Sequence, residues 1–206
     1  AVRDALRMCP TEVPASLSIP AHKALDAVAQ RLALGVDHTV IALFGGTGSG
    51  KSSLFNALTQ LNFADVGARR PTTSRAAACS WGDDAGPLLD FLGVSSERRI
   101  RRDSILDAED QGSMSGLVLL DVPDYDSVTT EHSLQVDRLV PLADILVWVV
   151  DPQKYADAAL HDGYLRGLGA RQEDMLVLVN QVDTLPESGL ASLLDDVGSL
   201  LKEDGL

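Results

Sequence analysis

The fold of this 206-residue chain is decided by the stretch Gly45-Gly46-Thr47-Gly48-Ser49-Gly50-Lys51-Ser52. The apolar run Thr39–Phe44 stands directly before it, and apolar residues recur at helical spacing behind it. Glycines leave the backbone N–H groups of such a loop free to wrap an anion, and the positive end of the following helix points at the same place. A strand, this loop and a helix, in that order, predict a site for the phosphates of a nucleotide.

Two side chains at the end of the loop carry their own chemistry. Lys51 can reach the β- and γ-phosphate oxygens of a nucleotide, which makes it a catalytic candidate, and Ser52 offers a hydroxyl to Mg²⁺. A side chain at Gly45 or Gly50 would obstruct the approach of the phosphates. We assign nucleotide binding to a run of consecutive residues, which are Gly45, Gly46, Thr47, Gly48, Ser49, Gly50, Lys51, Ser52 and Ser53.

Four short apolar runs indicate the strands of a buried sheet. They are continuous rather than alternating in hydrophobicity, which is typical of parallel strands covered on both faces. The runs are Thr39–Phe44, Leu117–Val122, Ile145–Val150 and Met175–Val179. Helical patterns separate them, so the sequence predicts an α/β domain with a doubly wound, mostly parallel sheet and helices on both faces.

The domain is expected to span residues 35–206, behind an N-terminal segment and helix in residues 1–34. Ser18 and Pro20 favour a helix start in that first part. Residues 61–116 are less regular than the rest of the domain. We expect there a long loop, then a strand at 75–81, a short helix at 87–92 and a polar stretch at 95–115.

Composition and charge restrict the classes of function. Hydrophobic residues make up 45% of the chain, enough for a packed core, and 30 acidic against 17 basic residues give a formal net charge of −13. This acidic balance gives no strong signal for nucleic-acid binding. The two cysteines, Cys9 and Cys79, favour a reducing, cytoplasmic setting. No apolar run reaches the ~20 residues that span a bilayer, and residues 1–20 lack the apolar segment of a signal peptide.

A carboxylate stands at the end of the second apolar run. Leu117–Val122 carries Asp121 where a strand would reach its carboxyl end, beside the phosphate loop of a parallel sheet. We assign Asp121 to nucleotide binding through Mg²⁺, either as a direct ligand or through a water. An aspartate before Pro123 that merely forms a turn is the alternative.

With the phosphate loop and the segment Asp121-Val122-Pro123-Asp124, the chain resembles a P-loop GTPase of the translation-factor class, close to its Era-like and bacterial dynamin-like branches. Residues 121–128 and 147–155 are similar to actinobacterial GTPase domains of the Era-related, YfjP-like subfamily. The resemblance covers residues 35–204 and implies a Ras-like fold, GTP or GDP as ligand and Mg²⁺ as cofactor. Relatives often carry membrane-spanning segments behind this domain, so we expect membrane association, at the cytoplasmic face, only through regions absent from this chain.

Two positions depart from the pattern of that class. Relatives have a glycine at position 124, whose backbone N–H contacts the γ-phosphate, and Ras-like relatives follow it with a glutamine that orients water. Here Asp124 would repel a phosphate unless it points away, and the phenol of Tyr125 cannot both accept from and donate to a water as an amide does. We therefore expect hydrolysis to be slow, or to depend on a partner or a dimer.

The segment Asn180-Gln181-Val182-Asp183 follows the last apolar run and resembles the Asn-Lys-x-Asp turn of GTPases. The resemblance implies that Asp183 accepts two hydrogen bonds from guanine, for which adenine offers no matching donors. It implies that Asn180 braces the loop and that Gln181 replaces the lysine whose stem covers the base. A plain turn behind a strand is the alternative.

The segment Arg69-Arg70-Pro71-Thr72-Thr73-Ser74 lies where GTPases place their first switch. Its Pro-Thr-Thr wording is similar to that of dynamin-like relatives, which implies that Thr73 completes the Mg²⁺ shell and takes part in catalysis. Thr72 is the second choice for that role, and a surface cluster of threonines is the alternative.

We therefore predict a GTPase whose Mg²⁺-dependent, slow GTP hydrolysis acts as a conformational switch. The alternative is a nucleotide-gated binding module with negligible hydrolysis, as the soluble head of a membrane-associated dynamin-like protein. An ATP-using P-loop kinase is a third candidate, against which the turn at 180–183 weighs. The chain behind Asp183 has room for one helix alone, so we expect the last strand and helix of the class to be lacking. The apolar strand Met175–Val179 would then keep an open edge, and a homodimer is the expected partner besides the nucleotide.

Overall fold

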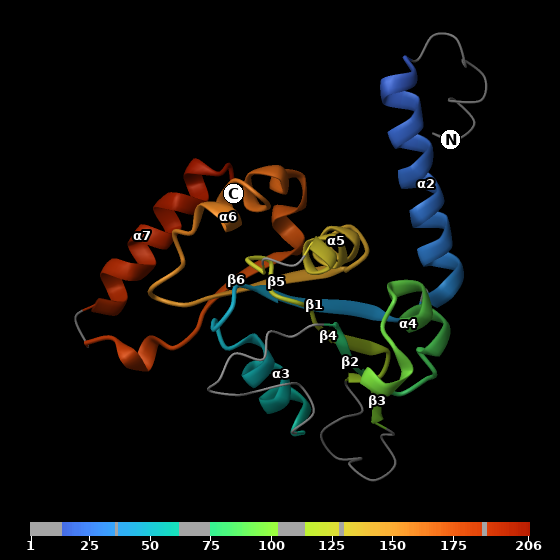
Figure 1. Cartoon of the computed structure of the whole chain (residues 1–206), viewed down its shortest axis with the longest axis horizontal. Helices are drawn as coiled ribbons and strands as arrows, with labels where there is room; N and C mark the ends of the chain where they lie inside the picture. Colours follow the sequence, from blue (N-terminus) through green and yellow to red (C-terminus); the bar gives the residue numbers. More distant parts are fainter. Residues whose placement is uncertain (1–13, 36, 62–74, 103–113, 128–129, 187–188) are drawn as a thin grey trace. The chain divides into compact units, whose positions relative to one another are not determined.

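The structure is a computed structural model that describes residues 14–35, 37–61, 75–102, 114–127, 130–186 and 189–206 (Figure 1). The chain divides into two units, Ala1–His38 and Thr39–Leu206. In the described part of the chain, the first unit contains one helix and the second contains the sheet with the other helices.

Helix α2 of the first unit spans Ala15–Gly35 and begins earlier than the sequence indicates. Ser18 and Pro20 predicted the start. The carbonyl of Pro14 already accepts hydrogen bonds from the backbone N–H groups of Leu17 and Ser18. The first turn therefore closes on Pro14, and Pro20 lies inside the helix.

The second unit is built on a six-stranded sheet with the order β3-β2-β4-β1-β5-β6. The strands are β1 (Thr39–Gly45), β2 (Ala77–Trp81), β3 (Arg99–Arg102), β4 (Leu117–Asp121), β5 (Ile145–Val150) and β6 (Met175–Val179). Strands β4, β1, β5 and β6 are parallel, whereas β2 runs antiparallel to β4. The doubly wound, mostly parallel sheet predicted from the sequence is confirmed.

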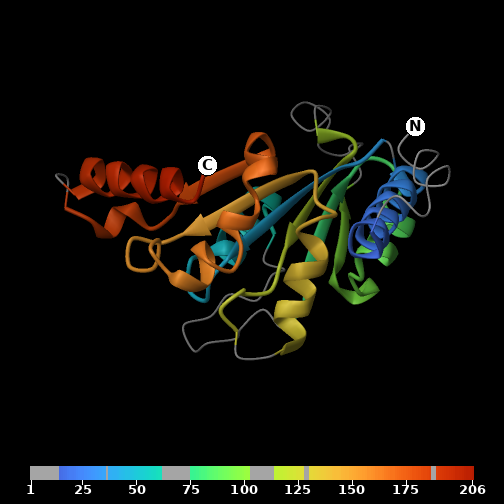
Figure 2. The ribbon, with the colours of Figure 1, turned by 90° about the horizontal axis from the view of Figure 1, so that it is seen from above.

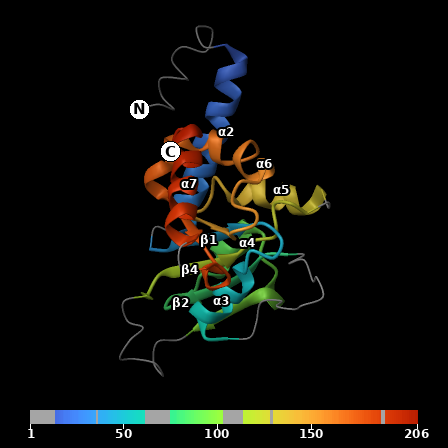
Figure 3. The same cartoon turned by 90° about the vertical axis from the view of Figure 1, so that its left-hand side faces the viewer.

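Helices cover both faces of this sheet. They are α3 (Lys51–Thr59), α4 (Gly86–Leu92), α5 (Thr130–Leu139), α6 (Ala158–His161) and α7 (Gly189–Glu203), with short 3₁₀ turns η1 (Ser96–Arg98), η3 (Leu165–Gly167), η4 (Gly169–Asp174) and η5 (Val182–Thr184). Figures 1 and 3 show α5 on one side of the sheet and α3 on the other. Helix α7 lies beside β6 at one end of the sheet (Figure 2). None of the described helices combines the length and the apolar character that a bilayer crossing requires.

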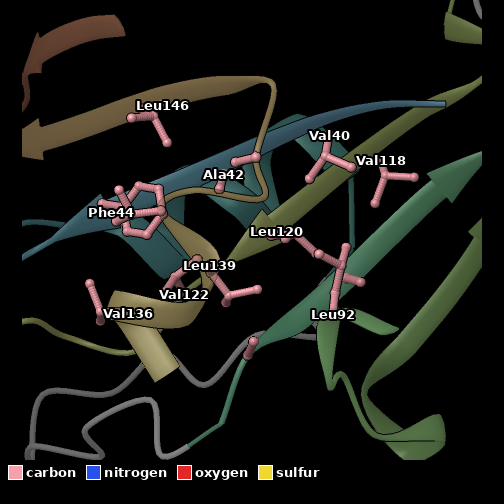
Figure 4. Packing of buried hydrophobic residues seen from close by; sticks show 14 of the residues in the cluster. Val40, Ala42, Phe44, Leu92, Val118, Leu120, Val122, Val136, Leu139 and Leu146 are labelled. Carbon is pink, nitrogen blue, oxygen red and sulfur yellow. The ribbon is translucent and has the colours of Figure 1, made fainter. Parts of the chain in front are cut away.

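The core lies in two layers because neighbouring residues of a strand point to opposite faces. The larger layer contains Phe44, whose ring stacks on Trp148 at a centroid distance of 4.9 Å, together with Leu139 of α5 (Figure 4). The smaller layer contains Leu43 and Phe55 of α3. Because residues near the strand ends are buried in these layers, the loops that follow the strands start from fixed positions.

Strand β3 was not anticipated, because the sequence placed its residues in a polar stretch. Its four residues are Arg-Ile-Arg-Arg, and they pair with β2 in parallel register, Ala78 opposite Arg99. The strand lies at the end of the sheet and its side chains are half-buried or exposed, so charged residues are tolerated there. Hydrophobicity alone therefore does not reveal it.

Strand β6 differs from the expectation that it would be buried on both faces. In the described residues it pairs with β5 alone, at the other end of the sheet. Met175, Val177 and Val179 pack against the larger core layer, but Leu176 and Leu178 are 60% and 37% exposed. An unbroken apolar run thus forms a strand with one open face.

Leu139 and Leu134 offer a matched pair for testing the core, since both lie on α5 and are 0% and 62% exposed. We expect Leu139→Ala to lower the free energy of unfolding by about 2–4 kcal/mol, because it leaves a cavity in the larger layer. Leu134→Ala should change it by less than about 0.5 kcal/mol. Urea denaturation followed by tryptophan fluorescence measures both, and equal losses would contradict the packing described here.

Candidate nucleotide-binding site

The glycine-rich loop joins β1 to α3, and the packing of the protein itself requires its glycines. A Cβ on Gly45 would lie 2.4 Å from the carbonyl oxygen of Val149 in β5. Gly50 has a φ of +89°, a left-handed conformation that L side chains rarely adopt, and a Cβ there would lie 2.2 Å from Nδ2 of Asn180. Both glycines therefore permit close contact between the loop and neighbouring strand ends, in addition to the room they leave for an anion.

Lys51 is buried at the first position of α3, with 3% of its surface exposed. Its Nζ donates a hydrogen bond to Oδ1 of Asp124 at 2.6 Å and lies 4.0 Å from Oδ1 of Asp121. The sequence suggested that Asp124 would have to point away from a phosphate. Instead, its carboxylate points at the lysine that would contact the phosphates, because a buried ammonium group needs an anion.

Asp121 ends strand β4 and is fully buried. Its Oδ2 accepts a hydrogen bond from Oγ of Ser52 at 2.7 Å. Its other oxygen, Oδ1, is buried without a hydrogen-bond partner among the described residues. Burial raises the pKa of Asp121, and the charge of Lys51 acts in the opposite direction. A serine hydroxyl beside a carboxylate oxygen that accepts no hydrogen bond is a donor set that fits Mg²⁺, which prefers oxygen ligands.

A third carboxylate, Asp126, comes from the segment behind β4 and contacts the glycine-rich loop. Its Oδ1 accepts hydrogen bonds from the backbone N–H of Thr47 at 2.7 Å and from the Thr47 hydroxyl at 2.8 Å. Nζ of Lys154 lies 3.4 Å from its Oδ2 and donates to the carbonyl of Thr47 at 2.9 Å. Burial alone would raise the pKa of Asp126, but the hydrogen bonds from Thr47 lower it below its ordinary value.

Sequence reasoning assigned no role to Asp126 or Lys154, since neither belongs to a motif of fixed spacing. One signal was available in the sequence. Lys154 follows the end of β5, and Asp126 follows the end of β4, so both stand at the same edge of the sheet as the loop. Carboxyl ends of parallel strands meet at one edge and build binding sites there.

The turn behind β6 reaches the opposite part of the loop. Asn180 donates from Nδ2 to the carbonyl of Ser49 at 2.8 Å, and Gln181 donates from Nε2 to the carbonyl of Gly48 at 2.7 Å. Gln181 itself has a left-handed backbone, with a φ of 56°. Asp183 follows in the 3₁₀ turn η5 and is exposed. The structure thus brings the turn at 180–183 and the phosphate loop together.

Ser53, also singled out from the sequence, does not join this cluster. Thr73 and the segment around it lie outside the described residues. Ser53 is exposed on α3.

Tyr125 is 7% exposed and packs its ring against Trp148 and Tyr164, so that burial raises the pKa of its hydroxyl. That hydroxyl lies beside the glycine-rich loop, 3.2 Å from where a Cβ on Gly46 would be. A side chain held in this way cannot move freely to orient a water.

The strand, loop and helix around Lys51, the acidic end of β4 and the turn behind β6 define a P-loop domain of the GTPase class. The sequence profile of the 50S ribosome-binding GTPase family matches residues 40–181, so the chain belongs to that family and is a GTP-binding GTPase domain. A search of curated proteins found no match.

Solved structures share the fold at low sequence identity. A chain of an oligomerised bacterial dynamin pair, linked to the sensing and tethering of membranes, has a TM-score of 0.56 and 16% identity over 88% of this chain and 33% of its own. Era, bound to MgGDPNP and part of 16S ribosomal RNA, has a TM-score of 0.52 and 15% identity over 78% of this chain and 46% of its own. A third structure comes from work on the chloroplast translocon components atToc33 and psToc159, in which dimerisation matters for GTPase activity. It has a TM-score of 0.52 and 14% identity over 94% of this chain and 72% of its own. This chain spans about a third of the length of the bacterial dynamin.

Asp124→Asn tests whether the carboxylate on Lys51 competes with a phosphate. We expect the variant to bind a non-hydrolysable GTP analogue about tenfold more tightly, because a negative charge no longer occupies the lysine or repels the phosphates. Without nucleotide its free energy of unfolding should fall by up to about 3 kcal/mol, since the buried ammonium loses its counter-charge. Calorimetric titration and urea denaturation measure the two effects. Asp195→Asn, which changes an exposed carboxylate on α7, should alter neither. Weaker binding of the GTP analogue by Asp124→Asn would contradict the competition.

Proposed function

We propose that this domain binds GTP and GDP with Mg²⁺ and hydrolyses GTP slowly, and that the exchange of carboxylates for phosphates on the loop works as a conformational switch. The observation that carries the proposal is the contact of two separate strand ends, those of β4 and β6, with one loop. Asp121 reaches Ser52, Asp124 reaches Lys51, and Asn180 reaches the carbonyl of Ser49. A nucleotide bound to that loop would meet all of these groups at once.

Ser52 and Asp121 would hold the magnesium ion. The ion supplies neutralisation of charge on the β- and γ-phosphates when it is bound. Oδ1 of Asp121, which is buried without a hydrogen-bond partner among the described residues, supports this role, because a hard cation would satisfy it. We further propose Thr73 as a ligand from the first switch, a residue that lies outside the described part of the chain.

The switch would act through the segment 121–126. A phosphate oxygen bound to Lys51 would lie close to the carboxylate of Asp124, which is held 2.6 Å from the same ammonium group, and the two anions repel each other. A triphosphate therefore has to displace Asp124, and loss of the terminal phosphate would allow the carboxylate to return. This segment leads into α5, so the displacement would be passed on to the N-terminal end of that helix.

Slow hydrolysis follows from Tyr125. The position that holds a water-orienting amide in Ras-like relatives holds here a buried phenol, packed between Trp148 and Tyr164. A nucleotide-gated binding module with negligible hydrolysis is the second candidate function, and the same observation favours it. A homodimer, which could supply the missing group, is proposed as a partner.

Base selectivity tests the guanine assignment of Asp183. We expect the unmutated chain to bind GDP far more tightly than ADP. Asp183→Asn should weaken GDP binding by about tenfold or more, because donors of the base lose their acceptor, and should tighten the binding of xanthosine diphosphate. Competition titration with the three nucleotides measures this. ADP binding as tight as GDP binding in the unmutated chain would refute the assignment.

Turnover separates the two candidate functions. With Mg²⁺ present, we expect single-turnover hydrolysis of GTP at about 10⁻⁴ s⁻¹ or slower, the intrinsic scale of a GTPase without its partner. Chelation of the ion, and Ser52→Ala, should each reduce this rate further, whereas Ser199→Ala on α7 should leave it unchanged. A rate above about 1 s⁻¹ in dilute solution would contradict the role given to Tyr125. Complete absence of turnover would favour the binding module.

A further inference from the structure

Three donors converge on the carboxylate of Asp126. Two belong to Thr47, which donates its backbone N–H at 2.7 Å and its hydroxyl at 2.8 Å to the same oxygen. The third is the ammonium group of Lys154, 3.4 Å from the other oxygen. Backbone N–H groups of a phosphate loop bind phosphate oxygens in a nucleotide complex. The carboxylate of Asp126 therefore marks a place on the loop that is built for an oxyanion.

Contacts at the other part of the loop give the nucleotide its direction. Asn180 and Gln181, from the turn assigned to the base, donate to the carbonyls of Ser49 and Gly48. Thr47 precedes these residues and faces the segment that carries Asp124 and Asp126 instead. A nucleotide with its base at the turn behind β6 would extend its phosphates toward Thr47. The position next to Thr47 that the carboxylate of Asp126 occupies would then lie near the terminal phosphate.

A second lysine contacts the carboxylates of the site. Asp121, Asp124 and Asp126 bring three carboxylates to the loop, in a chain with a formal net charge of −13. Lys51 is a buried cation that contacts Asp124 at 2.6 Å and Asp121 at 4.0 Å, and Lys154 is a cation that contacts Asp126. The side chain of Lys154 is 46% exposed and is also held by the carbonyl of Thr47 at 2.9 Å. It is thus fixed at the rim of the site and accessible to an incoming anion.

We infer that Lys154 is a further phosphate-binding and catalytic residue of this domain. Its ammonium group leaves the carboxylate of Asp126 and binds the terminal phosphate of GTP instead. The inference rests on the proposed function. In hydrolysis, a water oxygen forms a bond to the γ-phosphorus while the bond to the bridging oxygen breaks, and the electron pair stays with GDP. One proton of the water passes to an oxygen of the transferred phosphoryl group, so that the second product is inorganic phosphate. Lys154 keeps its protons throughout and stabilises the negative charge on the γ-phosphoryl oxygens and on the bridging oxygen.

Affinity for a triphosphate relative to a diphosphate tests the inference without relying on turnover. The probes are GDP and a non-hydrolysable GTP analogue, titrated with Mg²⁺ into the full chain and its Lys154→Ala, Lys154→Arg and Lys202→Ala variants. We expect Lys154→Ala to weaken the analogue about tenfold and GDP by less than about threefold, since only the terminal phosphate loses a charged partner. Lys154→Arg should restore most of the loss. Lys202→Ala, which removes an exposed lysine in the last turn of α7, should change neither affinity.

Two results would overturn this role. Equal weakening of GDP and the analogue by Lys154→Ala would mean that Lys154 only braces the carbonyl of Thr47. Unchanged affinity for both would mean that it contacts no phosphate. Either result leaves the proposed function standing if the unmutated chain binds GDP. An unmutated chain that binds neither nucleotide would instead refute the proposed function, and the inference with it.

Discussion

Lys51 carries an ammonium group into the interior at the N-terminal end of α3, where the helix dipole is positive as well. Two positive features at one buried point require an anion, because an unpaired buried charge is strongly unfavourable. The chain meets this requirement with Asp124 at 2.6 Å. The same requirement is what makes the place attractive to a phosphate. The loop and the segment behind β4 are arranged so that an anion, either Asp124 or a phosphate, lies at this point.

The sheet brings the necessary groups together. Strands β4, β1, β5 and β6 are adjacent and parallel, so their carboxyl ends lie along one edge. The loop after β1 therefore meets carboxylates from behind β4, a lysine from behind β5 and amides from behind β6. The two core layers hold the strands in register, and Gly45 and Gly50 let the backbone of the loop approach its neighbours closely. Packing and binding thus depend on the same contacts.

The sequence predicted the parts of this site that rest on local spacing. The loop, Asp121 and the turn at 180–183 each follow an apolar strand, and parallel strands place such residues together. Contacts that join distant segments without a motif were missed, as with Lys154 and Thr47, which are 107 residues apart. Hydrophobic pattern also misled at both ends of the sheet: β3 is too charged to be recognised, and β6 is apolar on a face that the described chain leaves exposed. In each case, tertiary position decided what local pattern could not.

The carboxylates around the loop also bear on how fast a nucleotide can arrive. GTP and GDP are anions, and they approach a chain with a formal net charge of −13 whose loop presents Asp121, Asp124 and Asp126. Long-range electrostatics then slow the encounter instead of steering it. Dissolved salt screens electrostatic interactions between exposed charges, and at 0.1 M ionic strength little interaction remains beyond a separation of about 10 Å. Association with this domain should therefore become faster as salt is added, whereas the contacts made after arrival are short and are screened far less.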